Sequence, residues 1–311
     1  MRWLYFGTGL LSARFLEKLI ERRQAPTLVV TGTSKKSGRG RQLRHTPVFM
    51  VAHKMGIPII ETASLNDTII IKKIQMEAPH FFVVFDFGQI IPKELLSIPK
   101  IAPLNVHPSL LPKYRGAAPI IRAMMNGESY TGISVIKMND KIDAGDIVLQ
   151  EKIDIPFDIT RGELEETILE KACHLLERSF DGLKNGTISP YPQKGEASYA
   201  KKLTKNELWI NWNEDARVIK NKIHALSPIP GARSIFKEKI VQFLKAKLPD
   251  NLGFTLEPGK IYAKSKHLFI GTKTAPVEIL VLKPAGKREM TQIEFINGYR
   301  PDGLYFTSHI F

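Results

Sequence analysis

Short apolar runs alternate with amphipathic segments along the first half of the chain. The apolar runs occupy residues 2–6, 27–32, 81–85 and 103–107. Short runs without polar alternation predict strands that are buried on both faces. After the first run, helical spacing places on one face Leu11, Phe15, Leu16, Leu19 and Ile20. This alternation of strand and helix signals predicts an α/β domain with a largely parallel sheet.

Two further strands and a long helix follow. Residues 132–138 and 146–155 have the composition of strands, and residues 161–186 carry an apolar repeat near helical spacing. The repeat consists of Leu164, Ile168, Leu169, Ala172, Leu175, Leu176, Phe180 and Leu183. We expect this helix to complete a first domain over residues 1–188.

A turn-rich segment separates this region from the rest of the chain. It contains NGTISPYPQKGEASYAKKL, which is rich in Gly, Pro, Ser and Lys and has no clear period. We expect a linker at 189–203 and a second domain at 204–311, where a helical segment precedes short strand candidates separated by Gly, Pro and Asn. The expected fold class is α/β, with a Rossmann-like, mostly parallel sheet domain followed by a smaller OB-like β-barrel domain.

Composition adds limits on location and cysteine chemistry. No apolar run approaches the ~20 residues of a membrane-spanning helix, and the opening MRWLYFGTG reaches glycine too early for a secretory signal. We therefore expect a cytoplasmic protein. Cys173 is the single cysteine and has no partners at metal-ligand spacing, so we expect neither a disulfide nor a metal site.

The charge balance is strongly basic. The 45 Lys and Arg exceed the 31 Asp and Glu, for a formal net charge of +14. Residues 204–311 hold 17 of the basic and 10 of the acidic side chains, so the second domain is basic as well. Such a surface attracts polyanions, nucleic acid among them, although a general solubility effect would give the same total.

The glycine turn after the first strand does not fit a dinucleotide site. In that motif glycines let backbone amides approach a pyrophosphate at the start of a helix. Here the third glycine position is taken by Ser12, and the second strand ends in Thr-Gly-Thr rather than in an acidic residue. The sequence therefore disfavours a nicotinamide cofactor.

Polar side chains gather where the strand at 103–107 ends. Asn105 and His107 point to the same side of that strand, and ligand sites of open α/β sheets form at such strand ends. Asp143, in a later glycine-bearing loop, could orient the imidazole and favour its charged form. Spacing alone does not select Asp143 over Asp140 or Asp146, and a purely structural role for the His and Asn stays open.

The segments 104–119, LNVHPSLLPKYRGAAP, and 131–150, TGISVIKMNDKIDAGDIVLQ, resemble the signatures of a superfamily of transferases and hydrolases that use 10-formyltetrahydrofolate. By this resemblance, Asn105, His107 and Asp143 match the superfamily's catalytic Asn, His and Asp. The resemblance also implies folate binding by Phe87, Gly88, Gln89, Ile90, Ser109, Leu110, Leu111 and Pro112. The opening of the chain departs from the usual GTPxFA, because Gly9 replaces the Pro and Leu11 the Phe. Small or aromatic residues with less charge are common where this chain has Phe85, Asp86 and Phe87, and an Arg is more usual at His224.

Within the superfamily, the chain is most similar to the methionyl-tRNA formyltransferase family over nearly its whole length. The segments SYAKKLTK, ALSPIPGA and LKPAGKREM resemble that family's linker and C-terminal barrel. The basic segment 34–47 resembles an insertion that grips the acceptor stem, which implies tRNA binding by Lys35, Lys36, Arg39, Arg41 and Arg44. The implied partners are 10-formyltetrahydrofolate, as formyl donor, and methionyl initiator tRNA, bound by a monomer.

Three other functions compete with this interpretation. A sugar-nucleotide formyltransferase would keep the three polar residues but should have a different C-terminal domain. A folate hydrolase would use water in place of the amine. A non-catalytic RNA-binding protein would use the basic surfaces alone, and the intact trio of Asn105, His107 and Asp143 argues against it.

Overall fold

The computed structural model describes residues 1–37, 42–250 and 252–308. The chain forms two compact units. Unit 1 contains residues 1–117, 132–153 and 165–200, and unit 2 contains residues 118–131, 154–164 and 201–311. None of the described helices is long and apolar enough to cross a membrane.

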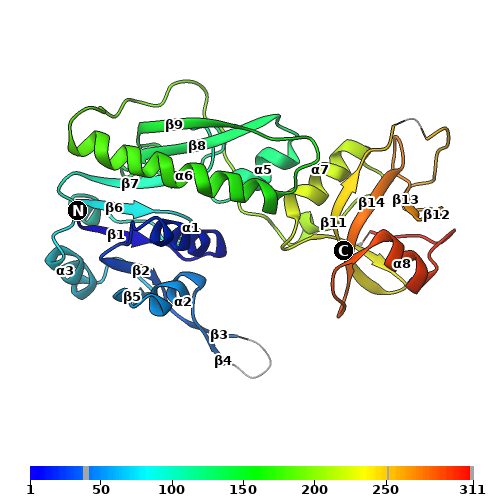
Figure 1. The fold of residues 1–311 in the computed structure, drawn as a ribbon, viewed down its shortest axis with the longest axis horizontal. Coiled ribbons are helices and arrows are strands. Elements are labelled where there is room, and N and C mark those ends of the chain that lie inside the picture. Colours follow the sequence, from blue (N-terminus) through cyan, green and yellow to red (C-terminus); the bar gives the residue numbers. More distant parts are fainter. Residues whose placement is uncertain (38–41, 251, 309–311) are drawn as a thin grey trace. The chain divides into compact units, whose positions relative to one another are not determined.

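Unit 1 is built on a sheet whose described strands follow the order β5-β2-β1-β6-β7-β8-β9 (Figure 1). These strands are β1 (Trp3–Phe6), β2 (Leu28–Gly32), β5 (Ile59–Thr62), β6 (Phe81–Val84), β7 (Ala102–His107), β8 (Tyr130–Lys137) and β9 (Asp146–Asp154). The pairs from β5 to β7 are parallel, and β8 runs antiparallel to β7. The predicted Rossmann-like, mostly parallel sheet is confirmed.

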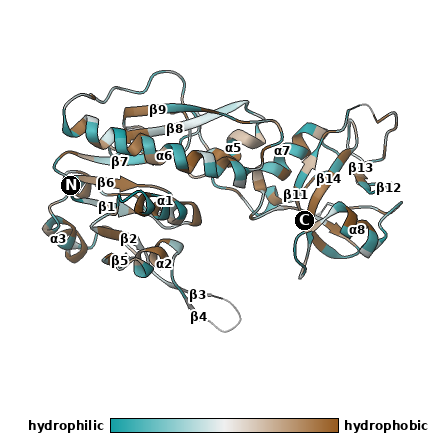
Figure 2. Ribbon diagram, viewed as in Figure 1, coloured by the Kyte–Doolittle hydropathy of each residue, from teal (hydrophilic) through white to brown (hydrophobic). Residues whose placement is uncertain are grey.

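Helices cover both faces of this sheet, which explains why its inner strands are apolar throughout. Side chains alternate along β1, so Trp3 and Tyr5 meet one layer while Leu4 and Phe6 meet the other. The first layer is α1 (Leu10–Glu21) with α6 (Arg161–Lys184), and the second includes α3 (Thr68–Met76) and α4 (Lys93–Leu96). Figure 2 shows the apolar character of β2 and β6.

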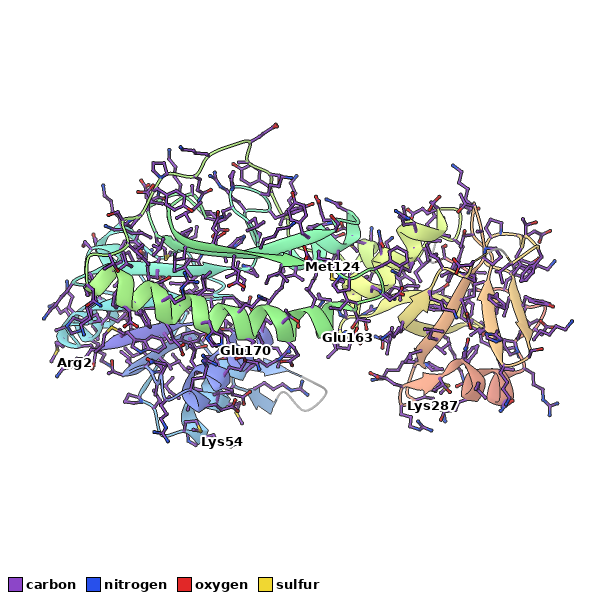
Figure 3. The ribbon with its side chains drawn as sticks, turned by 45° about the horizontal axis from the view of Figure 1, so that its top comes forward. Arg2, Lys54, Met124, Glu163, Glu170 and Lys287 are labelled. Carbon is purple, nitrogen blue, oxygen red and sulfur yellow. The ribbon has the colours of Figure 1, made fainter. Side chains whose placement is uncertain are left out.

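Ion pairs join α1 to α6 along their solvent side. Arg22 contacts Glu170 and Glu177, at 2.9 Å to each, and Arg14 contacts Glu165 at 2.9 Å. Glu170 is labelled on α6 in Figure 3. These partly exposed pairs fix the register of the two helices more than they add to stability.

A short hairpin precedes α2 (Pro47–Lys54) in unit 1. Its strands are β3 (Lys35–Ser37) and β4 (Gln42–Arg44), paired in the register Lys35 to Arg44. The helix then begins at Thr46, whose hydroxyl accepts a hydrogen bond from the Phe49 amide, and Pro47 stands in the first turn. The basic segment thus leads directly into a well-capped helix.

Unit 2 is the predicted smaller β domain, and its main sheet is antiparallel with the order β10-β11-β14-β13-β12. Its elements are α5 (Pro119–Met125), η1 (Asn206–Leu208), α7 (Ala216–Leu226), β10 (Ala232–Phe236), β11 (Lys239–Lys247), β12 (Ile261–Lys264), β13 (His267–Ile270), β14 (Val277–Pro284), β15 (Met290–Thr291) and α8 (Gln292–Tyr299). Its core includes Trp212, Phe243, Phe295 and Phe306.

Candidate active site

The carboxyl ends of β1, β6 and β7 bring three connections together at one edge of the sheet. These strands are parallel neighbours, with Phe6 opposite Val84 and Val84 opposite Asn105. The turn at 7–9 and the loops at 85–92 and 108–118 therefore start side by side. This edge is where open α/β sheets place their ligand sites.

The three polar residues predicted from sequence meet in unit 1. The Asn105 side-chain amide donates to Asp143 Oδ1 at 2.9 Å, and the backbone amide of Gly116 donates to Asp143 Oδ2 at 2.8 Å. His107 Nδ1 lies 3.6 Å from the same Oδ2 atom. Asp140 and Asp146 are exposed, so the geometry selects Asp143 among the three aspartates of this region.

Backbone groups hold the imidazole of His107. The ring is 6% exposed, and Nε2 lies 2.8 Å from the carbonyl oxygen of Tyr114. A carbonyl only accepts, so Nε2 carries a proton and donates it. Nδ1 is then the nitrogen that faces the Asp143 carboxylate.

The first group of predicted folate residues lies in the loop after β6. Phe87 packs on Phe6 with ring centroids 5.8 Å apart, and the Gln89 amide donates to the carbonyl of Thr62 at 2.8 Å. Gly88 is exposed, and Ile90 is 74% exposed. Phe87 and Gln89 therefore anchor the loop, while Gly88 and Ile90 are accessible.

The second group lies in the loop after β7. Ser109 is fully buried, and its hydroxyl donates to the Lys113 carbonyl at 2.7 Å. Leu111 is buried in a small cluster with Ile136 and Ile147. Leu110 and Pro112 are half-buried, so they are the members of this group with accessible surface.

Asp86 fills the space above the glycine turn. A Cβ atom built on Gly9 would lie 1.9 Å from Asp86 Oδ2, and the backbone amides of Thr8 and Gly9 point to the Asp86 carbonyl, at 3.1 and 3.4 Å. Although the residue as a whole is exposed, burial of its carboxyl group raises the pKa of Asp86 to about 6, against a hydrogen bond from the Ser12 backbone. Gly9 and Asp86, two of the expected departures from the family pattern, are therefore in contact.

The predicted tRNA-binding residues belong to the hairpin segment. Lys35 and Lys36 lie in β3, and Arg44 lies in β4 and is exposed. Arg39 and Arg41 fall outside the described residues. The hairpin therefore brings the segments that carry Lys35 and Arg44 next to each other.

Sequence reasoning missed one side chain that contacts the site. Gln193 donates to the carbonyls of Asp143 and Gly145, at 2.8 Å to each, and accepts from Arg115. It lies some fifty positions from Asp143 in a segment without periodicity. No pattern in the sequence around Gln193 indicated this contact, because the two segments meet only in the folded chain.

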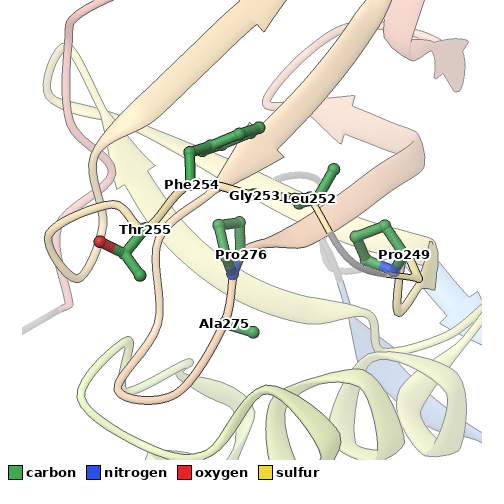
Figure 4. Close-up of a pocket in the computed structure, with 7 residues that line it drawn as sticks. All are labelled: Pro249, Leu252, Gly253, Phe254, Thr255, Ala275 and Pro276. Carbon is green, nitrogen blue, oxygen red and sulfur yellow. The ribbon is translucent and has the colours of Figure 1, made fainter.

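A hollow of unit 2 is unrelated to this chemistry. It has a volume of about 540 Å³ and is lined by prolines, Leu252, Gly253, Phe254, Thr255 and Ala275 (Figure 4). Its described lining offers neither a carboxylate nor an imidazole. Among the described residues, no group of three or more His, Cys, Asp or Glu is arranged to hold a metal ion.

Comparisons with known proteins agree on one family. Residues 1–179 match the formyl transferase family, and residues 202–300 match the formyl transferase C-terminal domain. The methionyl-tRNA formyltransferase of Thermodesulfovibrio yellowstonii is 37% identical over 95% of both chains, and that of Carboxydothermus hydrogenoformans is 38% identical over 97% of both.

A solved structure shares the fold at lower identity. HypX from Aquifex aeolicus, in complex with tetrahydrofolic acid, superposes with a TM-score of 0.67 and 20% identity. The match covers 98% of this chain and 48% of HypX, so the chain spans about half the length of that protein.

Proposed function

Because the chain belongs to the formyl transferase family, and within it to the methionyl-tRNA formyltransferases, we propose that it transfers a formyl group from 10-formyltetrahydrofolate to methionyl initiator tRNA. The family predicted from the sequence is confirmed. The acceptor is the free amino group of the methionine, and the product serves translation initiation. We expect the enzyme to act as a cytoplasmic monomer.

The observation that carries the proposed chemistry is the contact of Asp143 with both Asn105 and His107. In the proposed reaction, the amine nitrogen attacks the formyl carbon and the carbonyl oxygen becomes an oxyanion. The bond from that carbon to N10 of the folate then breaks, as the amine loses a proton and N10 gains one. The transfer needs no covalent enzyme intermediate.

Asn105 and His107 are suited to stabilise the oxyanion. A primary amide has two hydrogens, and Asn105 directs one of them to Asp143. The second is the proposed donor to the oxyanion, together with the imidazole of His107. Loss of one such donor typically costs ~3 kcal/mol in the transition state. Asp143 would hold both donors in place.

The attacking amine must be neutral. The α-amino group of an amino acid has a lower pKa than a lysine side chain, so a strong base is not required to deprotonate it. The remaining contribution of the protein is orientation of a large acceptor toward a bound folate. The accessible Gly88, Ile90, Leu110 and Pro112 are our candidates for the folate contacts, and the hairpin segment is our candidate for tRNA contact.

The experiment that tests this function incubates the protein with 10-formyltetrahydrofolate and charged initiator tRNA and measures formylmethionine. We expect His107→Ala to lower kcat by about 100-fold or more, the effect of losing one oxyanion donor. The dissociation constant for tRNA should stay within about twofold, because positioning contacts are untouched. Unchanged turnover in this variant would contradict the assigned chemistry.

Two controls complete the test. His174 lies on α6 with its side chain 56% exposed, and His174→Ala should leave kcat unchanged. A nucleotide sugar carrying an amino group is the alternative acceptor, since sugar-nucleotide formyltransferases would use the same trio. Formylation of that sugar in place of the tRNA would replace the proposed acceptor.

A further inference from the structure

The segment 189–200, which we name the strap, is fastened near both ends to unit 1. Tyr191 pairs with Ile147 through two backbone hydrogen bonds of 2.8 and 2.9 Å. Near its other end, Arg115 donates to the carbonyl of Ser198 at 2.8 Å and accepts from the amide of Ala200 at 2.6 Å. The strap therefore connects β9, which follows the Asp143 turn, to the loop after β7.

Gln193 is the strap residue whose side chain contacts the Asp143 turn. Its flanking residues, Pro192 and Lys194, are exposed, whereas Gln193 is half-buried. Its side-chain nitrogen lies 2.8 Å from the carbonyl oxygens of both Asp143 and Gly145. Its side-chain oxygen accepts from the Arg115 guanidinium, at 2.6 and 3.2 Å. Both hydrogens and the oxygen of this carboxamide thus have partners in the two loops that surround the trio.

The turn that Gln193 holds has an unfavourable backbone. Asp143 has a φ of 49°, in the left-handed region that costs a residue with a Cβ roughly 1 kcal/mol or more. Such a conformation persists only where surrounding contacts impose it. The turn must keep this backbone conformation if the Asp143 carboxylate is to reach Asn105 and the amide of Gly116.

We propose that Gln193 is a positioning residue for formyl transfer, which holds the Asp143 turn so that its carboxylate reaches Asn105 and His107. This inference rests on the proposed function. Only a neutral amide can donate to two carbonyls and also accept from Arg115. Gln193 acts through Asp143 and does not touch the reacting atoms.

The test uses Gln193→Glu, which keeps the shape and the acceptor for Arg115 but replaces both donated hydrogens by an oxygen. We expect kcat to fall about tenfold or more, because small misplacements of a catalytic group are costly. KM for folate and for tRNA should stay within about twofold. Amide exchange of residues 140–146 should speed up about tenfold, since a bond that restrains the turn is lost. Gln193→Met, which brings no charge, should shift each quantity in the same direction by less.

The matched control is Gln75→Glu, an exposed position on α3 where no change is expected. A second arm repeats Gln193→Glu in an Asp143→Asn background, where we expect less than about a threefold further loss of kcat, because coupled residues are not additive. Equal losses in both backgrounds, or unchanged kcat and exchange, would overturn the inference. Absence of formyl transfer by the unaltered protein would instead reject the proposed function, and the exchange measurement would still test Gln193.

Discussion

A glycine is required at position 9 because of its neighbour Asp86, and not because of its own backbone conformation. Its φ of −76° is open to any residue, yet an added Cβ would lie 1.9 Å from Asp86 Oδ2. Asp86 in turn belongs to the loop that carries Phe87 and Gln89. Gly9 and Asp86 therefore form one packing unit at the strand ends.

We expect Gly9→Ala to lower the free energy of unfolding by about 1–3 kcal/mol, the usual cost of overpacking. The cost should fall below about 0.5 kcal/mol in an Asp86→Ala background, because the clashing atoms are gone. Urea denaturation of the two single variants and the double variant measures this coupling. Gly88→Ala is the control, since no atom lies within 4 Å of a Cβ built there. Additive effects would show that Asp86 is not the obstacle.

At the scale of residues, the sequence predicted side chains better than it predicted backbone groups. Asn105 and His107 could be paired from strand alternation, whereas the choice of Asp143 over Asp140 or Asp146 needed the resemblance to a family. The carbonyl of Tyr114 and the amide of Gly116 hold two of these side chains, but any residue type supplies such groups. For that reason no sequence pattern indicates them.

At the scale of elements, an ion pair joins α5 to η1 within unit 2. Arg122 donates to both carboxylate oxygens of Glu207, and the amide of Thr204 donates to the same carboxylate at 2.8 Å. The bonds from Arg122, followed by those from Thr204, lower the pKa of Glu207 to about 2 against the effect of burial. The ion pair thus connects α5, in the segment 118–131, to η1, near the start of the segment of unit 2 that begins at residue 201.

This lowered pKa predicts a pH-dependent contribution to stability. The contribution is present above the unfolded pKa of Glu207, about 4.5, and is lost as pH falls through about 2. We expect Glu207→Gln to cost roughly 1–2 kcal/mol at pH 7, a value reduced for solvent screening because a third of the side chain is exposed.

Denaturant unfolding of Glu207→Gln and the unaltered protein from pH 7 to pH 2 measures this contribution. The difference in stability should shrink toward the acid end. Glu289→Gln, at an exposed position, is the control. A difference that stays constant with pH would contradict the ionic origin.

Local sequence patterns predicted most helices and strands, but they were less informative for a helix that buries few apolar side chains. The strands β1, β2, β6, β7, β8 and β9 and the helix α6 follow the expected ranges within a few residues. No expectation covered α8, where Phe295 is buried and Ile296 and Tyr299 are only partly buried against the same core. Its capping box of Thr291 and Glu294 is the signal that could have revealed it.

At the scale of the whole molecule, local patterns do not tell which core an element joins. Residues 118–131 and 154–164 belong to unit 2, and Ile121 and Met125 of α5 pack against its core. An apolar face at helical spacing looks the same whichever core it meets. The fold class was therefore predictable, whereas these two segments were not assigned to unit 2 from sequence.

The net charge of +14 gives the last prediction, which concerns salt. Neutralising phosphates releases counterions, so affinity for tRNA should fall linearly with salt on a logarithmic scale. Arg39→Ala removes one proposed phosphate contact, and we expect it to weaken tRNA binding and to reduce that slope by about 1. Filter binding between 50 and 200 mM salt, a range of about fourfold over which such slopes are measurable, tests this.

Lys72→Ala, at an exposed position on α3, should keep the slope. Equal slopes for Arg39→Ala and the unaltered protein would mean that Arg39 makes no phosphate contact. The salt dependence of tRNA binding would then come from other basic residues of the chain.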